Sequence, residues 1–144
     1  MSEIDTKILF MKDSHRDMIK PDKFLIIWLQ AVKSGSIENI MALYDKNALL
    51  IPTFSNKVLN TPSKIKDYFV TLQKRRKLNV KLHPKTVHLQ RISDTVYSVS
   101  GIYQWQFEVE NELLSFEARF SFVFDINKKS PIINHHSSQV PRMI

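Results

Sequence analysis

Apolar residues recur at helical spacing in the first third of the chain. The clearest stripe occupies positions i, i+3, i+4 and i+7, which form the face that a packed helix buries. It consists of Phe24, Ile27, Trp28 and Ala31. Proline suits the first turn of a helix, and glycine suits the left-handed residue that ends one. The pattern therefore predicts a helix that begins at Pro21 and ends at Gly35.

Two more helices and a short strand are predicted before residue 78. Ser36 is a suitable N-cap for a short helix over residues 37–43. Residues 48–51 are apolar and predict a short buried strand. Thr61-Pro62-Ser63 then opens a helix over residues 64–77. Its apolar stripe is formed by Ile65, Tyr68, Phe69 and Leu72.

After Leu78 the pattern changes to alternation of apolar and polar residues, which is typical of strands. The alternating stretches predict four strands, at residues 80–91, 96–103, 114–126 and 132–140. Helices followed by strands with short connections indicate an α+β fold with an antiparallel sheet. We expect this sheet to curve strongly around the helices, which gives a cone-shaped fold with a pocket at its mouth. The domains are predicted as an N-terminal arm, residues 1–20, and a single domain, residues 21–144.

The composition of the 144 residues is that of an ordinary folded domain, with 43% hydrophobic and 24% charged residues. Cysteine is absent, which excludes disulfides and thiolate metal sites, and two glycines leave no glycine-rich phosphate loop. The formal net charge of +7 favours an anionic partner without identifying it. No apolar run approaches the roughly 20 residues of a membrane span, and no secretory signal is visible. We therefore expect no membrane partner and a cytoplasmic protein.

The most unusual string is His135-His136-Ser137-Ser138, which lies in a predicted strand. Adjacent strand residues point to opposite faces of a sheet. His136 and Ser138 are therefore expected on one face, and His135 and Ser137 on the other. Two interpretations stay open: a polar pocket, or a solvent face with a hydrogen-bonded core histidine on the other side.

Metal and nucleophile motifs are not found in the sequence. The two neighbouring histidines diverge on a strand, the other histidines show no HxH or HExxH spacing, and no GxSxG elbow occurs. The other histidines are His15, His83 and His88. We therefore expect no metal and no other cofactor.

Two groups of cations need an explanation. The run Lys74-Arg75-Arg76-Lys77 suits a solvated helix end, and no base-stacking aromatic residues interleave it, so we expect no nucleic-acid partner. Arg119 lies within an aromatic strand, where it either pairs with Glu117 on the same face or binds an anion. If the phenylalanine residues of that strand face the core, Arg119 points away from it.

Six short motifs occur in register along the chain. They are Leu43-Tyr44, Leu49-Leu50-Ile51-Pro52-Thr53 with Ser55-Asn56, Asp67-Tyr68-Phe69, Ser100-Gly101-Ile102-Tyr103, Ala118-Arg119-Phe120-Ser121-Phe122 and His135-His136-Ser137-Ser138. Together they resemble the nuclear transport factor 2-like superfamily, and within it the group of the calcium/calmodulin-dependent protein kinase II association domain. They are most similar to the bacterial and algal branch, which includes the iota-class carbonic anhydrases. The resemblance covers roughly residues 24–141.

This resemblance implies a homodimer or larger homo-oligomer and the reversible hydration of carbon dioxide to bicarbonate. Some members are described as using a metal and others none, and we expect the metal-independent form. The catalytic residues that it implies are Thr53, Tyr68, His136 and Ser138. The substrate-binding residues that it implies are Arg119 and Tyr103. Hydroxyl groups would orient water and bicarbonate, and a histidine would accept the proton.

The chain departs from the family pattern at three places. Val140-Pro141-Arg142 replaces Met-Pro-Glu, Ser130-Pro131 replaces an aromatic residue, and Gln104-Trp105 replaces Thr-Phe. These changes concern activity more than fold, because a fold does not determine a function. The alternative is a non-catalytic oligomerising domain whose pocket binds a small carboxylate.

Overall fold

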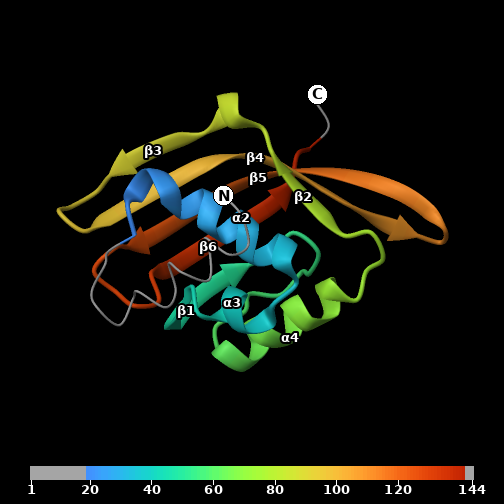
Figure 1. Cartoon of the computed structure of the whole chain (residues 1–144), viewed down its shortest axis with the longest axis horizontal. Coiled ribbons are helices and arrows are strands. Elements are labelled where there is room, and N and C mark those ends of the chain that lie inside the picture. Colours follow the sequence, from blue (N-terminus) through green and yellow to red (C-terminus); the bar gives the residue numbers. More distant parts are fainter. Residues whose placement is uncertain (1–18, 142–144) are drawn as a thin grey trace.

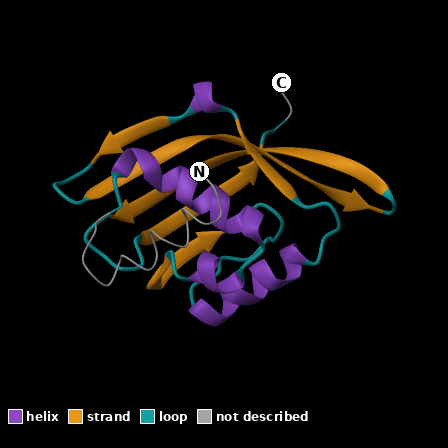
Figure 2. Cartoon of the chain, viewed as in Figure 1, coloured by secondary structure: helices purple, strands orange, loops and turns teal. Residues whose placement is uncertain are grey.

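Three α-helices gather on one face of a curved six-stranded sheet in the computed structural model, which describes residues 19–141 (Figures 1 and 2). The helices are α2 (Phe24–Ser34), α3 (Ile37–Met41) and α4 (Pro62–Gln73), with short 3-10 turns η2 (Pro21–Lys23) and η3 (Pro84–Thr86). The strands are β1 (Tyr44–Ile51), β2 (Asn79–Leu82), β3 (His88–Arg91), β4 (Val96–Val109), β5 (Glu112–Asp125) and β6 (Ile132–Gln139). Residues 1–18 of the predicted arm, and Arg142, lie outside the described residues.

The strands follow the order β1-β6-β5-β4-β2, and β3 also pairs with β4. β4 is long enough to pair with β3 in its first half and with β2 in its second half. All neighbours are antiparallel except β1 and β6, which run parallel. The predicted α+β fold with a curved, mainly antiparallel sheet is thus confirmed. The parallel pair joins β1 and β6, which are far apart along the chain. The alternation of apolar and polar residues does not reveal which strands pair.

The predicted helix ends are formed by local side-chain and backbone geometry. Gly35 has a φ of 73° and ends α2, and the Ser36 side chain accepts a hydrogen bond from the Asn39 backbone N–H at the start of α3. The third helix begins at Pro62, two residues before the predicted start, with Thr61 as its N-cap, and ends at Gln73, four residues before the predicted end. Lys77 has a φ of 58°, a left-handed conformation that cannot continue a helix.

The core lies between α2 and the inner face of the sheet. Phe24 of α2 stacks on Phe124 at 4.0 Å between ring centroids and meets Phe122 edge-on at 5.2 Å. Phe120, Phe122 and Phe124 are all buried, so the predicted parity of β5 is confirmed. Offset and edge-on aromatic pairs of this kind add to the free energy of apolar burial.

The cation run 74–77 is exposed to solvent, as expected, and also reaches partners on the sheet. Arg76 Nε and Lys77 Nζ lie 3.4 and 3.1 Å from the carboxylate of Glu108. The Arg75 guanidinium lies over the Phe107 ring, 5.3 Å from its centroid. Three of the four cations thus have partners on β4. Within residues 19–141, no helix combines the length and the apolar character that crossing a membrane requires.

We expect Gly35→Ala to lower the free energy of unfolding by about 1 kcal/mol, because an L-residue is strained at a φ of 73°. Steric overlap adds little, since the nearest atom to a Cβ there is Gln73 Oε1 at 3.6 Å. Urea denaturation measures the change. The exposed Lys33→Ala serves as the matched control, with an expected change below about 0.5 kcal/mol. Equal changes in both variants would contradict the left-handed conformation of Gly35.

Candidate functional site

The last strand, β6, carries two buried polar side chains, His135 and Ser137, each only 2% exposed. The antiparallel register with β5 explains their position. Phe122 pairs with His135, and Phe120 pairs with Ser137. Paired residues point to the same face of a sheet. Both polar side chains therefore point inward, like the buried phenylalanine residues of β5 with which they pair.

His136 and Ser138 share the opposite face, as their spacing predicted, and this is the outer face of the sheet. There they line a depression of about 210 Å³ with Arg119, Phe120 and Ser121. The Ser138 hydroxyl lies 3.3 Å from His136 Nε2. The predicted grouping of Thr53, Tyr68, His136 and Ser138 in one pocket therefore needs correction. The register of β5 and β6 turns His136 outward and places its neighbour His135 inside.

His135 lies at the centre of a buried hydrogen-bonded network. Its ring stacks on Phe122 at 3.9 Å between centroids. The Tyr44 hydroxyl lies 2.8 Å from Nδ1, and the Tyr103 hydroxyl lies 3.2 Å from Nε2. Trp28 Nε1 donates to the Tyr44 hydroxyl at 3.1 Å. Both nitrogens of this histidine are thus satisfied inside the core.

Burial, with a smaller contribution from the neighbouring His136, lowers the pKa of His135 from 6.5 to about 3. The imidazole is therefore neutral near pH 7, with one N–H donor and one acceptor nitrogen. The Tyr44 oxygen accepts from Trp28, which leaves its proton for Nδ1. In this tautomer Nε2 carries the proton and donates to the Tyr103 oxygen. The Tyr103 hydroxyl can then donate its own proton to another acceptor.

A small inner cavity of about 10 Å³ lies beside this network. Its polar lining consists of Trp28, Thr53, Tyr68, Tyr103, Trp105, His135 and Ser137. Thr53 Oγ1 and Ser137 Oγ are hydrogen-bonded to each other. The pKa of Tyr103 is raised, because the effect of burial exceeds the opposite effect of hydrogen bonding to Ser137. Burial also raises the pKa of Tyr68, to about 12. The polar groups that line the cavity are therefore neutral near pH 7.

A wider depression of about 300 Å³ opens to solvent on the other side of the Thr53–Ser137 pair. We call it the mouth. Its lining consists of Ile51, Pro52, Thr53, Ser55, Asn56, Lys57, Val58, Ser137, Ser138 and Gln139. Thr53 and Ser137 line both spaces, so their hydroxyl groups separate the inner cavity from the mouth. A small molecule that binds in the mouth can reach the inner cavity by displacing this pair.

The site is built from hydroxyl, indole and imidazole groups. Such neutral donors suit a small ligand rich in oxygen acceptors. Among the residues that the structure describes, no three histidine, aspartate or glutamate side chains come close enough to share a metal ion.

The structure brings together three of the six residues named from the sequence, Thr53, Tyr68 and Tyr103. Arg119 and His136 lie on the outer face, and Ser138 lies at the rim of the mouth. Sequence reasoning missed His135 and Ser137 because each strand face holds one histidine and one serine. The pairing of His135 with Phe122 decides between the two faces, and no sequence pattern gives that register.

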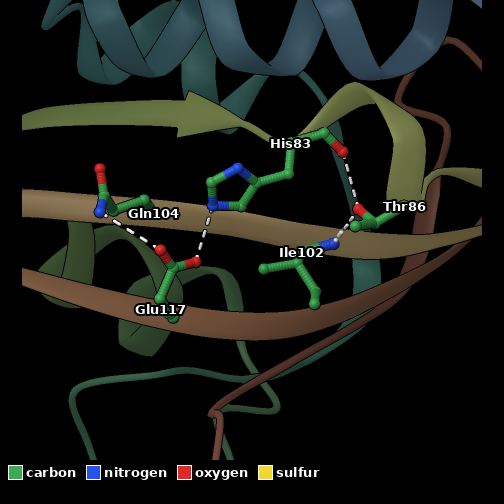
Figure 3. Close-up of polar contacts among 5 residues, drawn as sticks. All are labelled: His83, Thr86, Ile102, Gln104 and Glu117. Carbon is green, nitrogen blue, oxygen red and sulfur yellow. Dashed lines mark hydrogen bonds and ion pairs between the residues drawn. The ribbon is translucent and has the colours of Figure 1, made fainter.

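Glu117 has partners other than the expected Arg119. His83 Nε2 lies 2.8 Å from one carboxylate oxygen of Glu117, and Gln104 Nε2 donates to the other at 3.2 Å (Figure 3). The Thr86 hydroxyl donates to the His83 carbonyl oxygen and accepts from the Ile102 N–H, which anchors η3 to β4 (Figure 3). Arg119 forms no ion pair within residues 19–141.

Residues 16–141 match the sequence profile of the calcium/calmodulin dependent protein kinase II association domain. No curated protein sequence matches the chain. Among solved structures, the chain is similar to a protein from Xanthomonas campestris that is named as such an association domain. The TM-score is 0.75 at 25% identity, over 85% of this chain and 86% of that one.

Two more distant structures share the fold alone. One is a protein of the nuclear transport factor 2-like family from Streptomyces avermitilis, with a TM-score of 0.67 and 14% identity over 80% of this chain and 89% of that one. The other is a protein with a cystatin-like fold from Caulobacter vibrioides, with a TM-score of 0.69 and 9% identity over 83% of this chain and 87% of that one. These similarities confirm the expected fold class.

The low pKa of His135 predicts a specific loss of stability in acid. Between its ordinary pKa of 6.5 and about 3, the unfolded chain binds a proton that the folded chain does not. This contribution to stability is therefore complete above pH 6.5 and falls as the pH falls, by about 1.4 kcal/mol per pH unit.

Urea denaturation at about pH 7 and about pH 4.5 tests this, with His135→Gln compared to the exposed His136→Gln. We expect the wild type and His136→Gln to lose about 2 to 3 kcal/mol more than His135→Gln over this interval. A pH dependence that is unchanged in His135→Gln would contradict the buried, neutral state of this histidine.

Proposed function

The chain belongs to the calcium/calmodulin dependent protein kinase II association domain family, and we propose that within this fold it catalyses the reversible hydration of carbon dioxide to bicarbonate. The observation that supports this most directly is the meeting of Thr53, Tyr103 and Ser137 beside a buried neutral histidine. These residues lie in the motifs that resemble iota-class carbonic anhydrases. The site residues of the proposal are Thr53, Tyr68, Tyr103, His135 and Ser137.

The polarity of the site suits this substrate. Carbon dioxide has no charge, which matches the neutral lining, and because the inner cavity of about 10 Å³ holds about one oxygen atom, the rest of the molecule extends past Thr53 and Ser137 toward the mouth. Bicarbonate carries three oxygen acceptors, which match the hydroxyl donors of Thr53, Tyr68 and Ser137. Thr53 and Ser137 also line the mouth, so they offer the product a polar path to solvent.

The reaction joins a water oxygen to the carbon of carbon dioxide while one C=O bond becomes a C–O⁻ bond and the water releases a proton. Donors held in place before the reaction stabilise the oxygen that gains charge. Tyr103 is oriented for this role because His135 Nε2–H donates to its oxygen in the assigned tautomer. The proton leaves through the Thr53 and Ser137 hydroxyls to water in the mouth.

In this mechanism His135 positions Tyr103 and does not accept the proton. A group with a pKa of about 3 is a poor base near pH 7, and the ring is enclosed by Phe122 and Tyr44. The family resemblance implied that His136 accepts the proton. In this proposal His135 takes its place, and it acts as a positioning residue.

Stopped-flow measurement of carbon dioxide hydration tests the proposal. We expect Ser137→Ala and Thr53→Val to lower the rate by about 10²-fold or more, because each removes a hydroxyl at the reacting atoms. The outer-face variants His136→Gln and Ser121→Ala are matched controls, with expected rates within about twofold of the wild type.

Each outcome separates the alternatives. Loss of activity in His136→Gln with retention in Ser137→Ala would return the site to the outer face. Activity that disappears with a chelator and returns with a metal would replace the metal-independent form by a metal-dependent one. No hydration above the buffer rate in any sample would overturn the proposed reaction.

The second candidate is a non-catalytic oligomerising domain that binds a small carboxylate. The family match favours it, as does the absence of a good proton acceptor among the side chains that line the inner cavity. It predicts a homodimer or larger assembly by light scattering, with sodium formate raising the melting temperature without turnover. A monomer whose melting temperature is unchanged by formate would exclude this candidate.

A further inference from the structure

Trp105 presents a buried donor without an acceptor. Its side chain is 2% exposed, and of the buried side-chain nitrogen and oxygen atoms of residues 19–141, Nε1 of Trp105 alone has no hydrogen-bond partner. Its register partners on the neighbouring strands, Val80 and Phe116, offer only apolar side chains. Buried polar groups in folded proteins are almost always paired, so this atom calls for an explanation.

The other tryptophan shows the contrast. Trp28 is fully buried in the same core, and its Nε1 donates to the Tyr44 hydroxyl at 3.1 Å. Both tryptophans line the inner cavity, but only the donor of Trp105, which lies there beside Thr53, Tyr103 and Ser137, has no acceptor. The indole lies near enough to Tyr103 to lower the pKa of its hydroxyl, yet no acceptor meets the distance and angle of a hydrogen bond. An indole N–H can only donate, so its partner must be an acceptor atom.

We infer that Trp105 Nε1–H is a ligand donor, which binds one oxygen of bicarbonate or of a small carboxylate in the inner cavity. The inference rests on the proposed function, since it names a specificity-determining residue of the same site. It adds a fixed donor on β4 to the hydroxyl groups that the site already contains. No motif of the sequence singled this residue out as part of the site.

The size of the two spaces defines how the ligand lies. A cavity of about 10 Å³ accommodates about one oxygen atom. The remaining atoms of a planar oxyanion must extend past Thr53 and Ser137 toward the mouth, because these two residues line both spaces. One oxygen then accepts from Trp105 and Tyr103, and another accepts from Thr53 or Ser137.

The tryptophan content of the chain allows a direct test. The chain has two tryptophans, so a proton–nitrogen-15 spectrum contains two indole N–H signals, which the Trp105→Phe variant assigns. Sodium formate and sodium bicarbonate are titrated into the wild-type protein, with sodium chloride as the ionic-strength control. We expect saturable movement of the Trp105 signal with both oxyanions and none with chloride. Trp28 also lines the cavity, but its donor is already bonded to the Tyr44 hydroxyl, so we expect its signal to move less than that of Trp105.

Trp105→Phe supplies the second measurement. Phenylalanine keeps an aromatic ring against Phe54 and Tyr103 and removes the donor. We expect formate to bind about tenfold more weakly to this variant, as for a lost hydrogen bond to a charged group. If this variant does not fold, sequential resonance assignment of the wild-type protein identifies the two indole signals, and the wild-type titration then decides.

The outcomes distinguish this inference from the proposed reaction. Movement of the Trp105 signal without carbon dioxide hydration would support the binding site and overturn the reaction. Hydration that is equal in the wild type and Trp105→Phe, with a Trp105 signal that no oxyanion moves, would overturn the inference and keep the reaction. Equal movement of both indole signals with chloride would also overturn it, as a general effect of salt.

Discussion

The pairing register between β5 and β6 is the constraint on which the rest of the site depends. It places Phe122 opposite His135 and Phe120 opposite Ser137. The aromatic core that α2 buries therefore takes two polar side chains with it. A shift of one residue would exchange the two faces and bury His136 and Ser138 beneath α2 instead. Burial of the phenylalanine residues makes that exchange unfavourable, so the apolar core determines the polar site.

Burial then determines the chemistry that the site can perform. His135 is neutral because burial destabilises the charged imidazolium more than its hydrogen bonds stabilise it. Its two nitrogens join Tyr44 to Tyr103, and the direction of these bonds leaves Tyr103 as a donor toward the cavity. The result is a set of neutral donors in fixed positions, which suits an oxygen-rich ligand. Within the cavity lining, selectivity comes from position and size rather than from charge.

The outer face of the same sheet has a different character. Glu117 is bonded to His83 and Gln104, while Arg119 has no ion pair among the described residues (Figure 3). The depression beside Arg119 is polar and open, and it is separated from the inner cavity by the sheet itself. One strand thus contributes His135 and Ser137 to an enclosed site and His136 and Ser138 to an exposed surface.

What the sequence by itself determined is local: the apolar stripe of α2, the caps Gly35 and Ser36, and the alternation along β5. These features depend on residues a few positions apart, so periodicity and capping chemistry predict them. The sequence also showed that His135 and His136 face opposite ways, but it could not say which of them is buried. Only the tertiary structure decided that, together with the parallel pairing of β1 with β6 and the meeting of Thr53 with Ser137. Each of these features depends on contacts between residues far apart in the chain. The local pattern allows more than one arrangement, and burial of the whole aromatic core determines which one forms.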